Sequence, residues 1–197
     1  MNKINKNGEN YRIAPMRFNL VLMMIASSML FAGLVSAYIV HKPDALAKNT
    51  WTQFDLPVQF FISTILVLLS SVAMYMALRA AKQDELKQNS LFLAATLGLG
   101  ILFCVCQILG WRDLIDRGLP FVNARSEDIS ASYVWAITFV HALHAFGGLV
   151  LVSVALGKSM RYQIHKKELT LMKVAHTYWH FVGLLWIYLY LFLYFAG

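Results

Sequence analysis

Five apolar stretches that contain no charged residue constrain this chain more than any other feature. Each is at least 21 residues long and lacks Asp, Glu, Lys and Arg. At a rise of 1.5 Å per residue, a helix of about 20 residues spans the ~30 Å hydrocarbon core of a bilayer. Strands of a membrane β-barrel would alternate polar and apolar residues over about 10 positions, and these stretches do not.

The expected fold is an all-α membrane protein, a bundle of five transmembrane helices in a single membrane domain comprising residues 1–197. The expected helices are residues 18–40, 58–80, 89–111, 131–157 and 173–196. Composition agrees, because 59% of the residues are hydrophobic and 14% are charged, whereas soluble domains have about 25% charged residues. The first stretch exceeds the roughly 7–15 apolar residues of a signal peptide, and more spans follow, so we expect it to be a retained helix.

The distribution of Lys and Arg predicts the orientation of the chain. The N-terminal segment and the second and fourth connections carry twelve of these residues, and the first and third connections carry five. By the positive-inside rule, the N-terminus is expected in the cytoplasm and the C-terminus outside. The net charge of +7 is spread over short connections rather than gathered in one basic run, so no nucleic-acid binding is predicted.

Small residues predict close packing of the first helix. Ser28, Ala32 and Ser36 are spaced by four, with Gly33 and Ala37 beside them. Such a stripe lets another helix backbone approach closely. The partner helix can belong to this chain or to another subunit. The same role is expected of four glycines in the third and fourth stretches: Gly98, Gly100, Gly147 and Gly148.

Histidines are the candidate ligands inside the apolar stretches, because all ten acidic residues lie outside them. His141 and His144 share one helix face, and His176 and His180 share another. Neutral imidazole binds haem iron, copper and zinc. Counting along the stretches puts His144 and His180 several ångströms apart in depth, which disfavours a haem between them. Hydrogen bonds to other helices or to lipid headgroups, and another metal, remain as interpretations.

The last stretch carries the strongest family resemblance. Residues Tyr178–Trp186 read YWHFVGLLW and are similar to the YWHFVDxxW motif of haem–copper oxidase subunit III. The segment His141–His144, followed by Gly148, resembles that family's HGxHVxxG segment. Further similarities occur upstream, at Gln107, Trp111, Leu114 and Gly118, at Ser27–Phe31, and at Ala37 and Tyr38. The resemblance covers essentially the whole chain.

The resemblance implies a non-catalytic subunit III of a haem–copper oxygen reductase of the aerobic respiratory chain. Such a complex oxidises cytochrome c or quinol, reduces oxygen to water and pumps protons. No catalytic site, metal or cofactor is implied for this chain, because the haem and copper lie in partner subunits. The implied partners are oxidase subunit I above all, subunit II, further respiratory complexes and bound phospholipid, in a bacterial inner membrane.

The resemblance also suggests which residues contact lipid or other subunits. These are His144, Lys158, Arg161, Tyr178, Trp179, His180 and Trp186. Lys158 and Arg161 stand where the family has basic residues that meet phosphate, and snorkelling cations suit anionic headgroups.

Two positions depart from the family pattern. Ser28 replaces a glutamate and Gly183 replaces an aspartate, which removes the basis for a proton-collecting role. Two other functions remain open. One is a haem-binding membrane cytochrome that uses His141, His144, His176 and His180. The other is a nitric-oxide-reductase accessory protein of the same wider family.

Overall fold

The computed structural model describes residues 13–48, 51, 55–119, 121, 130–161 and 169–196, with side chains described from residue 16 onward. It contains five helices: α1 (Ile13–Ala47), α2 (Val58–Lys82), α3 (Leu86–Asp116), α4 (Ser130–Met160) and α5 (Thr170–Ala196). All five are long and apolar enough to cross a membrane. The predicted five-helix fold is therefore confirmed, and no strand occurs among the residues described.

The helices extend beyond the charge-free stretches that predicted them. Helix α3, for example, has 31 residues and ends at Asp116, whereas the prediction ended at residue 111. A helix of this length measures about 46 Å, which exceeds the ~30 Å hydrocarbon core. The ends of the helices therefore reach the headgroup region, where charged side chains are solvated.

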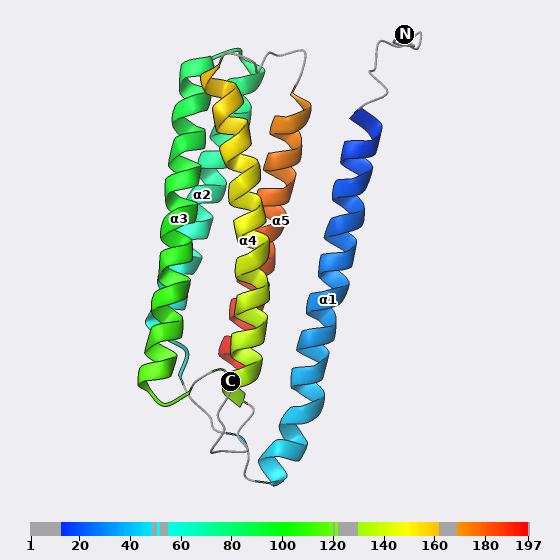
Figure 1. Ribbon diagram of the computed structural model, residues 1–197, viewed down its shortest axis with the longest axis vertical. Coiled ribbons are helices and arrows are strands. Elements are labelled where there is room, and N and C mark those ends of the chain that lie inside the picture. Colours follow the sequence, from blue (N-terminus) through cyan, green and yellow to red (C-terminus); the bar gives the residue numbers. More distant parts are fainter. Residues whose placement is uncertain are drawn as a thin grey trace.

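Helices α2 to α5 form a closed bundle. Helix α2 packs against α3 and α5, and α4 packs against the same two neighbours. Helix α1 stands beside this bundle and contacts α4 and α5 (Figure 1). One long side of α1 therefore lacks a partner helix among the described residues.

Aromatic rings attach α1 to the bundle near the C-terminus of α5. The ring of Tyr38 makes edge contacts with Trp51, Tyr133 and Phe192, with centroids 5.0–5.7 Å apart. The Tyr38 hydroxyl donates to the carbonyl oxygen of Ala196 at 3.0 Å, and Lys42 Nζ donates to the same oxygen. These bonds satisfy a carbonyl that the end of α5 leaves free, and the ammonium complements the negative end of the helix dipole.

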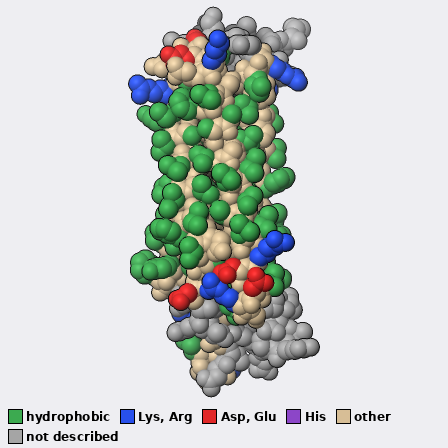
Figure 2. All heavy atoms as spheres, turned by 90° about the vertical axis from the view of Figure 1, so that its left-hand side faces the viewer, with side chains coloured by type: hydrophobic (Ala, Val, Ile, Leu, Met, Phe, Trp, Pro, Cys, Tyr) green, Lys and Arg blue, Asp and Glu red, His purple; other side chains and the backbone are tan. Residues whose placement is uncertain are grey.

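The surface is apolar along the middle and charged at both ends. Figure 2 shows hydrophobic side chains over the length of one face, with Lys, Arg, Asp and Glu gathered above and below. Such a band would be an aggregation hazard in water but matches a bilayer.

Candidate functional site

Two indole N–H groups of α5 bond to hydroxyls of α2. Trp179 Nε1 donates to Ser70 Oγ at 3.1 Å, and Trp186 Nε1 donates to Thr64 Oγ1 at 3.0 Å. Both tryptophans are buried, with 4% and 1% of their surface exposed. Residues seven apart lie on one face of a helix. The pair Trp179 and Trp186 can therefore meet α2 along one line.

Glycines make room for Trp179. A Cβ on Gly100 of α3 would lie 2.6 Å from the indole atom Cη2, and a Cβ on Gly148 of α4 would lie 3.0 Å from Cε3. The predicted packing role is confirmed at these two positions. A Cβ on Gly98 would meet nothing within 4 Å, so Gly98 does not pack against another described helix of this chain, and contact with another subunit stays a prediction there.

His141 is a core residue of the bundle. Its ring has no exposed surface and lies 4.9 Å from the Trp186 ring, centroid to centroid. Nε2 lies 3.0 Å from the carbonyl oxygen of Val182. A carbonyl only accepts, so Nε2 carries the proton and Nδ1 is left as an acceptor. Nδ1 is buried and has no partner among the described residues.

His144 links α1 to α4. Its Nδ1 donates to the carbonyl oxygen of Val140 at 2.8 Å, and its Nε2 lies 3.0 Å from Ser27 Oγ. Since the carbonyl fixes the proton on Nδ1, Nε2 is an acceptor. The single hydroxyl proton of Ser27 is shared between this nitrogen and the carbonyl oxygen of Met23, which lies 2.8 Å from Oγ. The Tyr178 hydroxyl donates to the backbone oxygen of His144 at 3.1 Å. The interpretation of His141 and His144 as hydrogen-bonding residues between helices is confirmed.

His176 and His180 contact each other on α5. Their Nε2 atoms are 3.1 Å apart, and both side chains are half-buried. The centroids of the two rings are 4.3 Å apart, with an interplanar angle of 70°. Neither ring meets His141 or His144, so the four histidines do not gather at one point.

The predicted difference in depth between His144 and His180 is wrong. Helices α4 and α5 are antiparallel, and the bonds of His141 to Val182 and of Tyr178 to His144 set their register. This register puts position 180 opposite about positions 142–143, close to the level of His144. The ends of charge-free stretches mark depth poorly, because a Lys side chain can extend along its helix to the interface. The two histidines instead point to different partners, His144 toward Ser27 of α1 and His180 toward His176 of α5.

The predicted lipid- or subunit-contacting residues divide into three groups by exposure, one of which is the half-buried pair His144 and His180. Tyr178, Trp179 and Trp186 are at most 4% exposed and lie inside the bundle, so they do not form the predicted surface. Lys158 and Arg161 are exposed at the end of α4. Neither forms an ion pair with another residue that the structure describes.

The small-residue stripe of α1 faces away from the bundle. Ser28, Ala32 and Ser36 are exposed, and a Cβ on Gly33 would meet nothing within 4 Å. Packing of this stripe against another helix of the same chain, one of the two predicted alternatives, does not occur among the described residues.

Gly183, which replaces the family's aspartate, lies where α5 meets α2. A Cβ at this position would be 3.3 Å from Ser71 Oγ and 3.4 Å from Val67 Cγ2. A longer side chain would therefore enter the contact between the two helices, and the hydroxyl of Ser71 is the nearest polar group.

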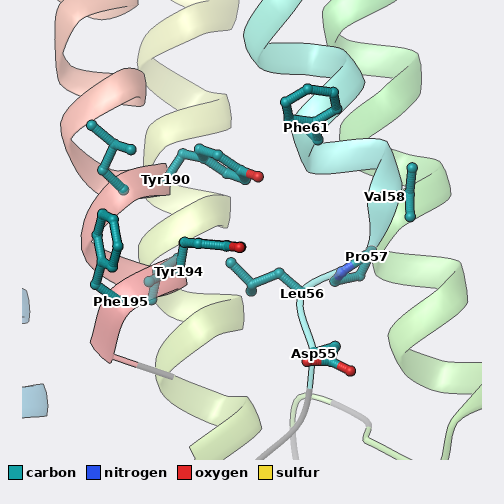
Figure 3. A pocket seen from close by; sticks show the side chains of 10 residues that line it. Asp55, Leu56, Pro57, Val58, Phe61, Tyr190, Tyr194 and Phe195 are labelled. Carbon is teal, nitrogen blue, oxygen red and sulfur yellow. The ribbon is translucent and has the colours of Figure 1, made fainter.

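A groove lies between the start of α2 and the end of α5. Its volume is about 990 Å³. Figure 3 shows Tyr190 and Tyr194 pointing from α5 toward α2, with Leu56 and Phe61 across from them and Asp55 at the edge. The walls are apolar, and the phenol and carboxyl groups are the polar ones. This groove is at the opposite end of the molecule from Lys158 and Arg161, and the sequence did not predict it.

Sequence reasoning also missed the hydroxyl and amide partners inside the bundle. Gln107 Nε2 donates to Ser63 Oγ at 3.1 Å, and Trp111 Nε1 donates to Thr138 Oγ1 at 3.0 Å. The available signal was the presence of Ser63, Thr64 and Ser70 inside an apolar stretch, because hydroxyl groups within a membrane helix tend to bond to side chains of neighbouring helices. No group of three or more His, Cys, Asp or Glu side chains is placed to hold a metal within the described parts of the chain.

These features define a multi-pass helical membrane protein whose intramembrane polar groups mainly join its own helices. The family model for cytochrome c oxidase subunit III matches residues 7–197. Two relatives are cytochrome c oxidase subunits 3. That of Corynebacterium diphtheriae is 25% identical over 89% of this chain and 85% of the relative. That of Thermostichus vulcanus is 27% identical over 89% of this chain and 84% of the relative. The cytochrome bo(3) ubiquinol oxidase subunit 3 of Buchnera aphidicola is 25% identical over 89% of each chain. The chain belongs to the cytochrome c oxidase subunit III family.

Proposed function

We propose that this chain is a non-catalytic subunit of a haem–copper oxygen reductase, in which it stabilises subunit I and holds phospholipids. The complex reduces oxygen to water with electrons from cytochrome c or quinol and pumps protons. The observation that carries the proposal beyond family membership is the exposed small-residue stripe of α1, because it offers a contact surface that no other described helix of this chain covers.

The stripe suits a transmembrane helix of subunit I. Lipid tails are as apolar as Leu side chains, so helices associate in membranes through close van der Waals packing and interhelical hydrogen bonds rather than by hydrophobic burial. Small residues such as Ser28, Ala32 and Ser36 permit this close approach. Helix α1 also has the free side that such a partner requires, since it contacts α4 and α5 alone among the described helices.

A pair of leucine substitutions tests the interface. Ser28→Leu combined with Ala32→Leu should leave the helix content of the purified chain unchanged, because both sites are exposed. The amount of subunits I and II that co-purifies with the chain should fall. Ala26→Leu is the matched control, since Ala26 is also exposed but lies on a different part of the helix surface. Unchanged recovery of subunit I with the double variant would contradict the proposed interface. Co-purification with nitric oxide reductase subunits instead would favour the alternative accessory role.

Deletion of the gene tests the supporting role. The remaining complex should retain the normal haem spectrum of subunit I and lose activity faster during turnover. If the haem spectrum is lost from an otherwise assembled complex, this chain contributes to cofactor binding and the proposal is wrong.

Phospholipid binding is proposed at both ends of the molecule. Lys158 and Arg161 are exposed cations at one end, where anionic headgroups attract basic side chains by about 1 kcal/mol each. At the other end, the apolar groove beside Tyr190 and Tyr194 has room for part of an acyl chain. Native mass spectrometry of the detergent-extracted complex should detect retained phospholipid, and Lys158→Gln with Arg161→Gln should reduce anionic lipid selectively. Equal lipid content in the variant would exclude a role for these cations.

The proposed location is a bacterial inner membrane, with the N-terminus in the cytoplasm. The charge distribution supports this orientation. Single cysteines introduced near each terminus should react with a membrane-impermeant maleimide from opposite sides of the membrane, in a background where Cys104 and Cys106 are replaced. Labelling of the N-terminal cysteine from the outside would reverse the proposed orientation.

A further inference from the structure

The contact between His176 and His180 has the geometry of a chelating pair. Their Nε2 atoms approach to 3.1 Å, which two neutral imidazoles achieve when one Nε2 donates its proton and the other accepts it. Both nitrogens therefore point toward the same small region of space. The spacing of four residues repeats the arrangement of paired histidine ligands on the helices of zinc sites.

The separation of the two nitrogens fits a metal ion. Imidazole nitrogens bind zinc at about 2.0–2.1 Å. Two ligands at that distance are about 2.9 Å apart in an octahedral or square arrangement and about 3.3 Å apart in a tetrahedral one. The observed 3.1 Å lies between these values. An ion can therefore replace the shared proton with little movement of either ring. The donor ring loses its proton from Nε2 and takes one up on Nδ1, so it stays neutral as the other tautomer.

We propose that His176 and His180 form a bidentate site for a divalent transition-metal ion of the Zn²⁺, Ni²⁺ and Cu²⁺ class, with water in the remaining coordination positions. Both side chains are half-buried rather than enclosed, and His176 lies about 9 Å along the helix from its start at Thr170. An ion can thus reach the pair from that end of the bundle and exchange. The site is independent of the proposed function in the oxidase.

The other two intramembrane histidines cannot make such a site. His144 uses both ring nitrogens, toward Val140 and Ser27. His141 donates from Nε2 to Val182, and its Nδ1 is fully buried. The pair on α5 thus differs from the pair on α4 because its two nitrogens face each other rather than other helices.

Among the described residues, Lys82 is a charged group that affects the pair. It is the last residue of α2 and lies close enough to His176 for an electrostatic interaction. Its positive charge opposes a bound cation and would favour a bound anion. Removing this charge therefore distinguishes a metal site from a phosphate site at the same place.

The test is Zn²⁺ binding to the full chain, purified in detergent without a polyhistidine tag and measured by isothermal titration calorimetry. The wild type should bind one Zn²⁺ per chain at this site. His176→Ala and His180→Ala should each weaken binding at least about tenfold, since loss of a mere outer-shell partner already costs roughly 10- to 100-fold. His176→Cys should retain binding, because thiolate is also a zinc ligand. Bound Cu²⁺ should show nitrogen hyperfine coupling from two imidazoles in its electron paramagnetic resonance spectrum.

Two controls make the result decisive. His41→Ala removes a histidine on α1, outside the pair, and should not change Zn²⁺ affinity. Lys82→Gln should strengthen Zn²⁺ binding. Absence of binding up to millimolar Zn²⁺, or equal affinity in His176→Ala, would overturn the proposal. Weaker Zn²⁺ binding in Lys82→Gln, together with inorganic phosphate binding in the wild type, would show an anion site instead. The melting temperature of each variant without metal identifies any variant that misfolds. If an alanine variant misfolds, His176→Cys still tests the site.

Discussion

Gly100→Ala should destabilise the protein because the ring of Trp179 occupies the space that a methyl group would need. The new Cβ would lie 2.6 Å from Cη2 of Trp179 and 2.7 Å from Cδ2 of Leu149. Carbon atoms rest at about 3.5–4.0 Å from each other, so the indole has to move by about 1 Å. Its hydrogen bond to Ser70 is 3.1 Å long, and a shift of this size would break it.

The cost follows from these two effects. Overpacking of a well-packed core costs about 1–3 kcal/mol, and an interhelical hydrogen bond in a membrane is worth about 0.6–1.7 kcal/mol. Together they predict a loss of about 2–4 kcal/mol in the free energy of unfolding. Gly148→Ala should cost less, because its Cβ would lie 3.0 Å from the same indole. Gly98→Ala is the matched control in the same helix, with open space around its Cβ.

Unfolding in mixed detergent and dodecyl sulfate micelles, followed by circular dichroism, measures these differences. A double-mutant cycle isolates the steric contact. Trp179→Phe removes the indole atoms Cη2 and Cζ2 that Gly100 faces, so Gly100→Ala should cost at least about 1 kcal/mol less in that background. If Gly100→Ala costs the same in both backgrounds, or no more than Gly98→Ala, the packing explanation is wrong.

Two further predictions concern the contact between α2 and α5. Thr64→Val should lower the free energy of unfolding by about 0.6–1.7 kcal/mol, because it leaves the buried N–H of Trp186 without its acceptor; in a Trp186→Phe background the effect should largely disappear, and Thr177→Val, at an exposed site of α5, should have none. Gly183→Ala should be tolerated within about 1 kcal/mol, since its Cβ would need shifts of only a few tenths of an ångström near Ser71 and Val67. Gly183→Asp, which restores the family's residue, should cost about 2.5–3.5 kcal/mol, because a carboxyl group would enter the apolar contact between helices. The same unfolding assay checks both series, and an equal effect of Ala and Asp at position 183 would show that charge is irrelevant there.

The positions that sequence reasoning identified correctly are those set by local chemistry. The five helices follow from stretches long enough to cross a bilayer, because each helix satisfies its own backbone hydrogen bonds. Gly100 and Gly148 were recognised as packing residues because a missing side chain permits close approach. The motif of residues 178–186 indicated the family without any knowledge of how the helices pack.

The depth of the histidines was misjudged for a physical reason. The charge-free stretches of α4 and α5 were aligned by their ends, but Lys side chains can extend to the interface and blur those ends. Interhelical contacts such as His141 with Val182 set the real register. Trp179 and Trp186 were likewise expected at the lipid or subunit surface, yet both lie inside the bundle.

The sequence by itself determined that this protein is a set of five membrane-spanning helices of the oxidase subunit III family. Only the tertiary structure decided how each helix is rotated. In a bilayer, residues that face lipid and residues that face other helices are equally apolar, so an amphipathic pattern does not reveal the inner face. Rotation depends on the fit between particular side chains, such as Trp179 against Gly100 and Gly148. This fit buries Trp186, leaves the small-residue stripe of α1 open, and leaves His176 and His180 to meet each other.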